Sequence, residues 1–138
     1  MTHIRFPYAE RSHSLFGTIK RPLMTLHLHS SLFDQWLVLN EVLVDTGADI
    51  SVVPLPLGQI LVDHIEEGQP THLGGVVSSV AMFNAFVHRV QAKVDEKPFE
   101  MPIAIALSET IPPIFGQKDA LDRFTARFVK GQELIIEL

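Results

Sequence analysis

The sequence predicts an all-β domain, and three features of the chain support this. Apolar and polar residues alternate over 23–29, so that Met24, Leu26 and Leu28 share one face of a strand. A continuous apolar stretch of strand length covers 35–44, and alternation returns over 133–138. Nine prolines and eight glycines are typical of a compact, turn-rich chain. The 138 residues suffice for one domain with a core, so we expect a single domain over 1–138.

The expected elements follow one another without an internal repeat or a linker. The mixed, polar segment 1–18 predicts an N-terminal arm or an outer strand. A turn around Ser30 and Ser31 separates the first two long strands, and residues 57–66 hold a short turn or helix. Further strands are expected at 50–53, which ends at Pro54 and Pro56, and at 85–94, 101–107, 128–129 and 133–138.

Three connecting segments carry more specific signals. Residues 69–79 contain the pair Gly74 and Gly75, which predicts a hairpin with a glycine tip. Residues 97–99 predict a turn region between two strands. Residues 119–124 predict a short helix with Leu121 and Phe124 facing inward.

Composition excludes several classes of partner. A net charge of −5 without a basic run argues against nucleic acid and anionic membranes. No apolar run approaches the ~20 residues that span a bilayer, and the N-terminus lacks the apolar segment of a signal peptide. Cysteine is absent, which leaves no disulfide framework and no cysteine nucleophile or metal ligand. A cytoplasmic protein is therefore expected.

The most informative segment is the run from Val42 to Pro54, in which two apolar strands flank Asp45-Thr46-Gly47-Ala48. An aspartate at the tip of a tight turn between buried strands is a candidate catalytic carboxylate. Aspartate and glycine are also common in ordinary turns, which is the plainer interpretation of the same residues. No other aspartate in the chain is followed by Thr-Gly or Ser-Gly.

This run resembles the active-site signature of the retropepsin-like aspartic proteases. Ile114-Phe115-Gly116 is similar to the family's second signature, in which a buried strand crosses behind the active-site loop and ends in glycine. The resemblance covers about 23–138, including a C-terminal phrase, Leu121-Asp-Arg-Phe124, found in small bacterial proteins of this type. It implies an all-β acid-protease half-barrel with a flap hairpin and one short C-terminal helix, acting as a homodimer.

The resemblance also implies an aspartic endopeptidase. Such enzymes activate water with two carboxylates that share one proton, because two like charges so close together cannot both ionise. The signature occurs once, so the second carboxylate is expected to be Asp45 of another subunit across a two-fold axis. Thr46 would bond across this axis, Gly47 would permit close approach of the partner and substrate, and Ala48 would keep the cleft floor small.

Substrate contacts follow from the same resemblance. Asp49 is expected to contact the main chain of a peptide substrate. Gly74, Gly75 and Val76 are expected to belong to the flap that covers the cleft. An apolar cleft flanked by Ile50, Val53 and Val76 would favour extended, apolar peptides. No metal or organic cofactor is implied.

The chain departs from the family pattern directly after Gly116. Retroviral members place an arginine there that pairs with the second aspartate of the signature, which corresponds to Asp49. This chain has Gln117 and Lys118 instead. Lys118 and Arg123 are the candidates for replacing that arginine, although a lysine lacks its forked geometry.

Two alternatives to an enzyme stay open. The first is a catalytically silent relative that serves as a dimerisation or peptide-binding module. The second is a metal site in which His27 and His29 chelate from one strand face, with His64, His72 or His88 as a third ligand. The alternation of 23–29 also explains that pair as the polar face of a half-buried strand.

Overall fold

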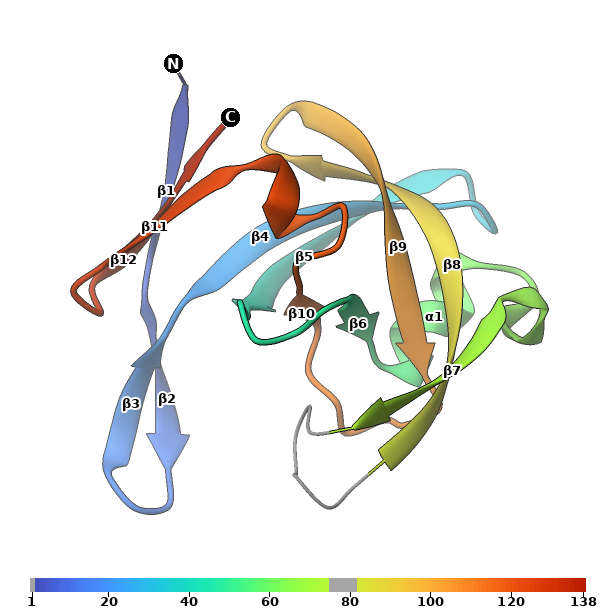
Figure 1. Cartoon of the computed structure of the whole chain (residues 1–138), viewed down its shortest axis with the longest axis horizontal. Helices are drawn as coiled ribbons and strands as arrows, with labels where there is room; N and C mark the ends of the chain where they lie inside the picture. The colour runs from blue at the N-terminus through green and yellow to red at the C-terminus, as the bar shows by residue number, and fades with distance from the viewer. Residues whose placement is uncertain (1, 75–81) are drawn as a thin grey trace.

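The computed structural model describes residues 2–74 and 82–138, and β-strands dominate these residues (Figure 1). The strands and short helices follow in the order β1 (His3–Pro7), β2 (Ala9–His13), β3 (Gly17–Arg21), β4 (Leu23–Ser30), β5 (Gln35–Val44), β6 (Ser51–Val53), α1 (Leu55–Leu61), η1 (Ile65–Glu67), β7 (Gln69–Gly74), β8 (Met82–Val94), β9 (Lys97–Ala106), β10 (Ile114–Phe115), η2 (Leu121–Arg123), β11 (Thr125–Val129) and β12 (Glu133–Glu137). Here α1 is an α-helix, and η1 and η2 are 3₁₀ helices.

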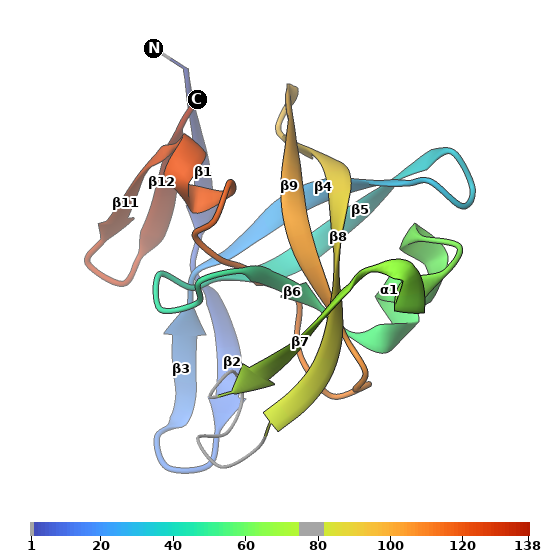
Figure 2. The ribbon, with the colours of Figure 1, turned by 45° about the vertical axis from the view of Figure 1, so that its right-hand side comes forward.

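The largest sheet closes on itself to form a barrel. Its strands run in the order β4-β5-β10-β6-β9-β8-β7, and β4 also pairs with β8. The short strand β10 lies between β5 and β6, parallel to the first and antiparallel to the second. Figures 1 and 2 show the long β8–β9 hairpin curving over the barrel, with β7 on its outer side.

The predicted alternation of β4 matches its burial. Met24, Leu26 and Leu28 are buried, whereas the residues between them are half-buried. These three side chains belong to the main core, which fills the barrel and extends to the second sheet. One face of β4 is buried, so apolar residues recur at every second position. This pattern made the strand predictable from its sequence.

A smaller apolar cluster lies apart from the main core. It contains Val52, Leu73, Ile111 and Ile114 among its buried members. Val53, the next residue on β6, belongs instead to the main core. Because successive side chains of a strand point to opposite faces, β6 separates the two clusters.

A second sheet and a separate hairpin involve the N-terminal residues. The strand β12 pairs with β1 on one side and β11 on the other, and the Leu138 N–H donates to the Thr2 carbonyl at 2.9 Å. The strands β2 and β3 then form a two-stranded hairpin that projects from the body, away from both termini (Figures 1 and 2). The segment expected to be an arm or an outer strand therefore contains both kinds of structure.

The predicted turn at 97–99 is wrong. Asp95 adopts a positive φ of 54° and makes the turn with Glu96, so that antiparallel pairing with β8 resumes at Lys97. Pro98 is tolerated there because β9 pairs with β6 only further along, over 103–105.

The predicted helix over 119–124 is shorter than expected. Asp119 has a positive φ of 52° and Ala120 is also non-helical, so only the 3₁₀ turn η2 forms. Leu121 is buried and Phe124 packs against the main core, as expected. The α-helix of the described residues is α1. Pro54 is its N-cap, and Pro56 lies in its first turn. No helix in 2–74 and 82–138 is long and apolar enough to cross a membrane.

Gly58 offers a test of how α1 packs on the barrel. A Cβ at this buried position would overlap the side chain of Ile105, which is itself fully buried on β9. We expect Gly58→Ala to lower the free energy of unfolding by roughly 1–3 kcal/mol, because overpacking outweighs the better helix propensity of alanine. Chemical denaturation measures this, and Gln59→Ala, on the exposed face of α1, should change the free energy by less than about 0.5 kcal/mol.

Candidate active site

Asp45 lies where the buried strand β5 ends. Residues Leu43 and Val44 pair with Ile114 and Phe115 of β10 in parallel register. The pairing continues one residue further, because the Asp45 N–H donates to the Phe115 carbonyl at 3.1 Å. The chain then turns back, and the Ala48 N–H donates to the Asp45 carbonyl at 3.2 Å. The backbone of Asp45 is therefore fixed on both sides.

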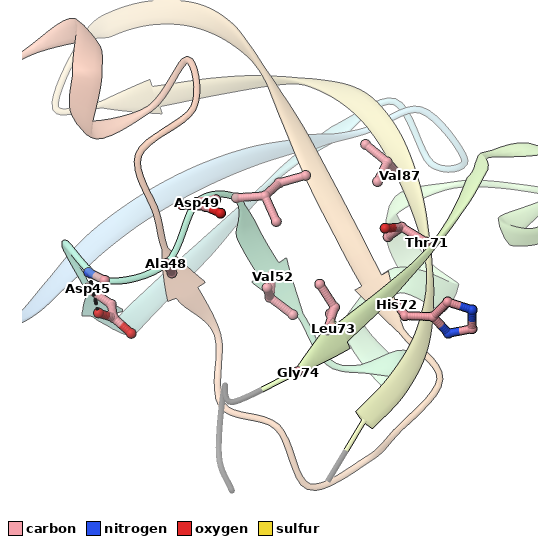
Figure 3. A pocket seen from close by; sticks show the side chains of 11 residues that line it. Asp45, Ala48, Asp49, Val52, Thr71, His72, Leu73, Gly74 and Val87 are labelled. Atoms are coloured by element: carbon pink, nitrogen blue, oxygen red, sulfur yellow. Dashed lines mark hydrogen bonds between the residues drawn. The ribbon is translucent and has the colours of Figure 1, made fainter. Parts of the chain in front are cut away.

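The Asp45 carboxylate is also held in one orientation. Its Oδ1 atom accepts a hydrogen bond of 2.8 Å from the Gly47 N–H (Figure 3). A Cβ at Gly47 would lie 3.2 Å from the same oxygen, so glycine leaves room for this contact. The Asp45 side chain is half-buried, whereas Thr46 and Gly47 are exposed.

Gly116 packs directly against the back of this turn. A Cβ at Gly116 would lie 2.6 Å from the Ile50 carbonyl oxygen and 2.8 Å from that of Ala48. Both contacts are with backbone atoms, which cannot rotate away, so only glycine fits. The Gly116 N–H donates to the Ser51 Oγ at 2.9 Å, and this serine is fully buried. The second signature thus supports the turn through backbone contact.

The residues after Gly116 continue this support. The Gln117 N–H donates to the Ala48 carbonyl at 2.9 Å, and the Lys118 N–H donates to the Asp49 carbonyl at 2.8 Å. The Gln117 side-chain amide also donates to the Thr46 carbonyl. The turn is therefore bound from behind at three carbonyls, those of Thr46, Ala48 and Asp49, and the bond to Thr46 comes from a side chain.

Among the described residues, neither candidate for replacing the missing arginine forms an ion pair with Asp49, and Lys118 contacts it through its backbone N–H. Arg123 donates instead to the carbonyls of Asp119 and Glu100, at 2.9 and 3.0 Å. Among the described residues, no ion pair includes Asp49. The side chain that does contact the turn is Gln117, which the sequence marked only as a departure from the family pattern.

A hollow of about 400 Å³ opens beside Asp45 (Figure 3). Its lining comes from the turn, from β6 and from the β7–β8 pair: Asp45, Gly47, Ala48, Asp49, Ile50, Val52, Thr71, His72, Leu73, Gly74 and Val87. Val52 and Leu73 belong to the smaller apolar cluster, which therefore forms the floor of the hollow. The lining combines these apolar side chains with polar ones, which include the carboxylates of Asp45 and Asp49.

A second hollow, of about 490 Å³, adjoins the same strand end. Leu43, two residues before Asp45, and Ile114, its partner on β10, both line it. Its outer wall includes Arg11 and Arg21 from the β2–β3 hairpin. Asp45 lines the first hollow only, and the second lies between the end of β5 and this hairpin.

The sequence-predicted residues divide into four groups. Asp45, Gly47, Ala48, Asp49 and Gly74 line the first hollow, and Ile114, Phe115 and Gly116 lie behind the turn. Thr46 is exposed outside the lining. Gly75 and Val76, together with the expected tip of the hairpin, lie outside the described residues.

Sequence reasoning misplaced one wall residue and missed others. Val53 does not line the hollow, because it faces the main core, and Val52 takes its place. Thr71, Leu73 and Val87 were not anticipated. Thr71 and Leu73 share one face of β7, and this spacing of two residues was the available signal.

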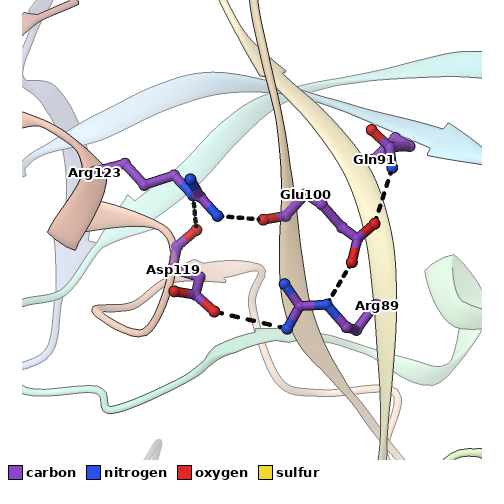
Figure 4. A network of polar contacts seen from close by, with 5 residues as sticks. All are labelled: Arg89, Gln91, Glu100, Asp119 and Arg123. Atoms are coloured by element: carbon purple, nitrogen blue, oxygen red, sulfur yellow. Dashed lines mark hydrogen bonds and ion pairs between the residues drawn. The ribbon is translucent and has the colours of Figure 1, made fainter.

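A polar network ties the segment behind the turn to the β8–β9 hairpin (Figure 4). Glu100 accepts hydrogen bonds from Arg89 and Gln91, and Arg89 also forms an ion pair of 3.6 Å with Asp119. The hydrogen bond and charge of Glu100 raise the pKa of Arg89, so this guanidinium stays charged at every physiological pH. These side chains are about half exposed, so each pair contributes little by itself.

The histidines considered as metal ligands are not gathered into one site. Over 2–74 and 82–138 no group of three or more histidine, aspartate or glutamate side chains lies close enough to hold a metal ion. His29 contacts Asp34 at 3.0 Å, and His88 contacts the Ile65 carbonyl at 2.7 Å.

Comparison with known proteins identifies the fold. No family model matches the chain, and neither does any curated protein. Among solved structures, a retropepsin-like aspartic protease from Rickettsia conorii is similar over 98% of this chain and 91% of that chain, with a TM-score of 0.60 and 14% identity. An inhibitor-bound EIAV protease is similar over 78% of this chain and 88% of that chain, with a TM-score of 0.46 and 24% identity. The chain has the retropepsin-like fold, which confirms the fold predicted from the sequence.

The bond between Ser51 and Gly116 predicts a stability effect. In Ser51→Ala the buried Gly116 N–H loses its acceptor, so the free energy of unfolding should fall by roughly 1–3 kcal/mol. Ser12→Ala, at an exposed position on β2, is the matched control and should leave it almost unchanged. Denaturant titration of the two variants compares them, and equal stabilities would contradict the supporting role of Ser51.

Proposed function

We propose that this protein is an aspartic endopeptidase that hydrolyses peptide bonds as a homodimer, with one Asp45 from each subunit. The observation that carries the proposal is the position of Asp45. Its carboxylate is fixed by the Gly47 N–H at the edge of a hollow, on a turn that is bound from behind through Gly116 and Gln117. The retropepsin-like fold supports the same reading.

A second copy is required by the chemistry. One carboxylate cannot serve as both base and acid, and the Asp-Thr-Gly sequence occurs once in the chain. Thr46 and Gly47 are exposed at the outer side of the turn, which leaves this surface open to a second subunit. A two-fold axis next to the turn would bring the two carboxylates together, and it would let each Thr46 contact the other subunit.

In the proposed reaction the two carboxyls share one proton. The ionised Asp45 takes a proton from water as the water oxygen attacks the peptide carbonyl carbon. The partner subunit's Asp45 gives its proton to the carbonyl oxygen. The tetrahedral intermediate then breaks its C–N bond: the protonated Asp45 gives its proton to the leaving nitrogen, and the partner's Asp45 takes a proton from a hydroxyl of the intermediate, so that the pair again holds one proton. Since the pair must hold a single proton, we expect cleavage to be fastest on the acidic side of neutrality.

The lining of the hollow supports an extended, apolar peptide as substrate. Ile50, Val52 and Leu73 present apolar surface, and β7 is the end strand of its sheet among the described residues. An unpaired strand edge beside the hollow can add a peptide as a further strand. In this proposal Asp49 contacts the peptide main chain, and the segment that includes Gly74, Gly75 and Val76 covers the bound substrate.

The catalytically silent module uses the same fold and the same open edge, but it assigns no role to the Asp45 carboxylate. A module that only binds peptides would retain its function when this carboxylate is neutralised. Substitution of Asp45 therefore separates the two proposals.

We expect Asp45→Asn to reduce peptide cleavage at least about a thousandfold, because the shared-proton pair is lost while the shape of the side chain is kept. Cleavage of a peptide library by the purified protein provides the measurement, with mass spectrometry of the products. Asp63→Asn, at an exposed position remote from the turn, should cleave like the unmodified protein. Cleavage that survives in Asp45→Asn would show that the dyad mechanism is wrong.

Gln117 should position the active-site turn through its side chain. Removal of its amide in Gln117→Ala deletes the bond to the Thr46 carbonyl, and we expect kcat to fall about five- to tenfold with a smaller change in KM. Lys118→Ala is a close control, because Lys118 binds the turn through its backbone N–H, which alanine retains. Similar kinetics for both variants would remove Gln117 from this role.

A further inference from the structure

The β2–β3 hairpin, residues 9–21, forms an arm that has no strand partner outside itself among the described residues. Figure 1 shows its turn end projecting from the body. An isolated two-stranded hairpin is marginally stable in water, because it has no sheet face to bury. This arm therefore needs contacts beyond its own pairing.

At its base the arm is fixed to the body near the active-site turn. Arg11 forms an ion pair of 2.7 Å with Glu41 on β5, and Lys20 donates to the Gln132 side chain at 3.4 Å. Directly after the arm, the Pro22 carbonyl accepts a bond of 3.0 Å from the Val44 N–H. Val44 immediately precedes Asp45, so the arm and the catalytic carboxylate share one rigid support.

The tip of the arm has a defined shape. His13 Nδ1 accepts hydrogen bonds from the N–H groups of Leu15 and Phe16, at 3.1 and 3.2 Å. The His13 ring also stacks on Phe16, with 5.0 Å between ring centroids. Gly17 closes the turn with a φ of +76°, a conformation that favours glycine. These interactions, all within the hairpin, give the tip a defined conformation.

This organised tip presents apolar side chains to solvent. Leu15 is 76% exposed and Phe16 is 68% exposed, the two highest values among the large apolar residues that the structure describes. Single exposed apolar residues are common, but two adjacent ones on a pre-shaped turn are well suited to binding, because little conformational freedom is lost. The tip therefore has the character of a contact surface.

Charge favours a second copy of this chain as the occupant. The arm contains Arg11, Lys20 and Arg21 against the single acid Glu10, a net charge of +2. The whole chain carries −5, which leaves −7 on the remainder. A basic arm and an acidic body are complementary between two copies, so electrostatic attraction favours contact of each arm with the partner's body.

We propose that the arm clasps the second subunit, with Leu15 and Phe16 seated on the partner's body. This inference rests on the proposed homodimer and deepens it. A stable dimer needs about 800 Å² and about 20–30 residues from each partner, far more than the short turn around Asp45 can supply. Two reciprocal arms add that surface. Each arm is attached to β5, the strand that leads to Asp45, so contact of the arms with the partner subunits also helps to align the two carboxylates.

The test compares association of the arm variant Leu15→Ser/Phe16→Ser with that of the unmodified chain, both carrying Asp45→Asn to prevent self-cleavage. Sedimentation equilibrium gives the dimer Kd. We expect it to rise at least about tenfold, because two apolar contacts are lost on each side of the dimer. Phe33→Ser is the matched control, since Phe33 is 57% exposed on the β4–β5 turn, and it should change Kd by less than about twofold.

A second measurement reports on the tip itself. The chain has no cysteine, so Phe16→Cys and Phe33→Cys each provide a single site for an environment-sensitive fluorophore. On dimerisation the emission from position 16 should shift to shorter wavelength, with the midpoint at the Kd, while that from position 33 stays constant. A constant emission at position 16, or an unchanged Kd for the tip variant, would overturn the clasp.

Failure of the clasp and failure of the proposed function are distinguishable. A dimer that cleaves peptides but ignores the tip substitutions contradicts the clasp alone. A dimer that depends on the tip but shows no Asp45-dependent cleavage supports the clasp and contradicts the peptidase. A chain that stays monomeric at every concentration contradicts the clasp and the composite site together, whatever else the tip binds.

Discussion

The contact on which the site depends is the one between Gly116 and the backbone of the turn that carries Asp45. Carbonyl oxygens of Ile50 and Ala48 lie 2.6 and 2.8 Å from the place where a Cβ of residue 116 would be. Such proximity lets β10 fit between β5 and β6, pairing with both. The position of the carboxylate is therefore set by main-chain contacts, which leave little freedom for it to drift.

Two apolar clusters share the barrel wall, and this division places the hollow. Consecutive residues of β6 serve opposite sides, because Val53 packs in the main core and Val52 in the smaller cluster. The main core stabilises the barrel independently of any ligand. The smaller cluster, with Leu73 and Ile114, lines open space and so combines packing with a binding surface.

Local patterns in the sequence predicted the strands with a single buried face and the turn around Asp45. They failed where distant contacts decide the conformation. The positive φ of Asp119 prevents the expected helix. It accompanies an ion pair with Arg89, which lies thirty positions earlier in the chain and outside any local sequence window. The cleft walls at Thr71 and Val87 depend on the register of β7 against β8, which only the folded sheet fixes.

Each chain builds the described part of its half of the proposed site by itself. The carboxylate orientation, the support from Gly116 and Gln117, and the floor formed by Val52 arise within one subunit. Folding of one chain therefore organises this half-site, and association of two chains then forms the proposed active site. Under the proposed mechanism, activity then follows the concentration of dimer, so any structure that strengthens association raises activity without touching the substrate. The arm, attached beside Val44 and carrying charge opposite to that of the body, is placed to have this effect.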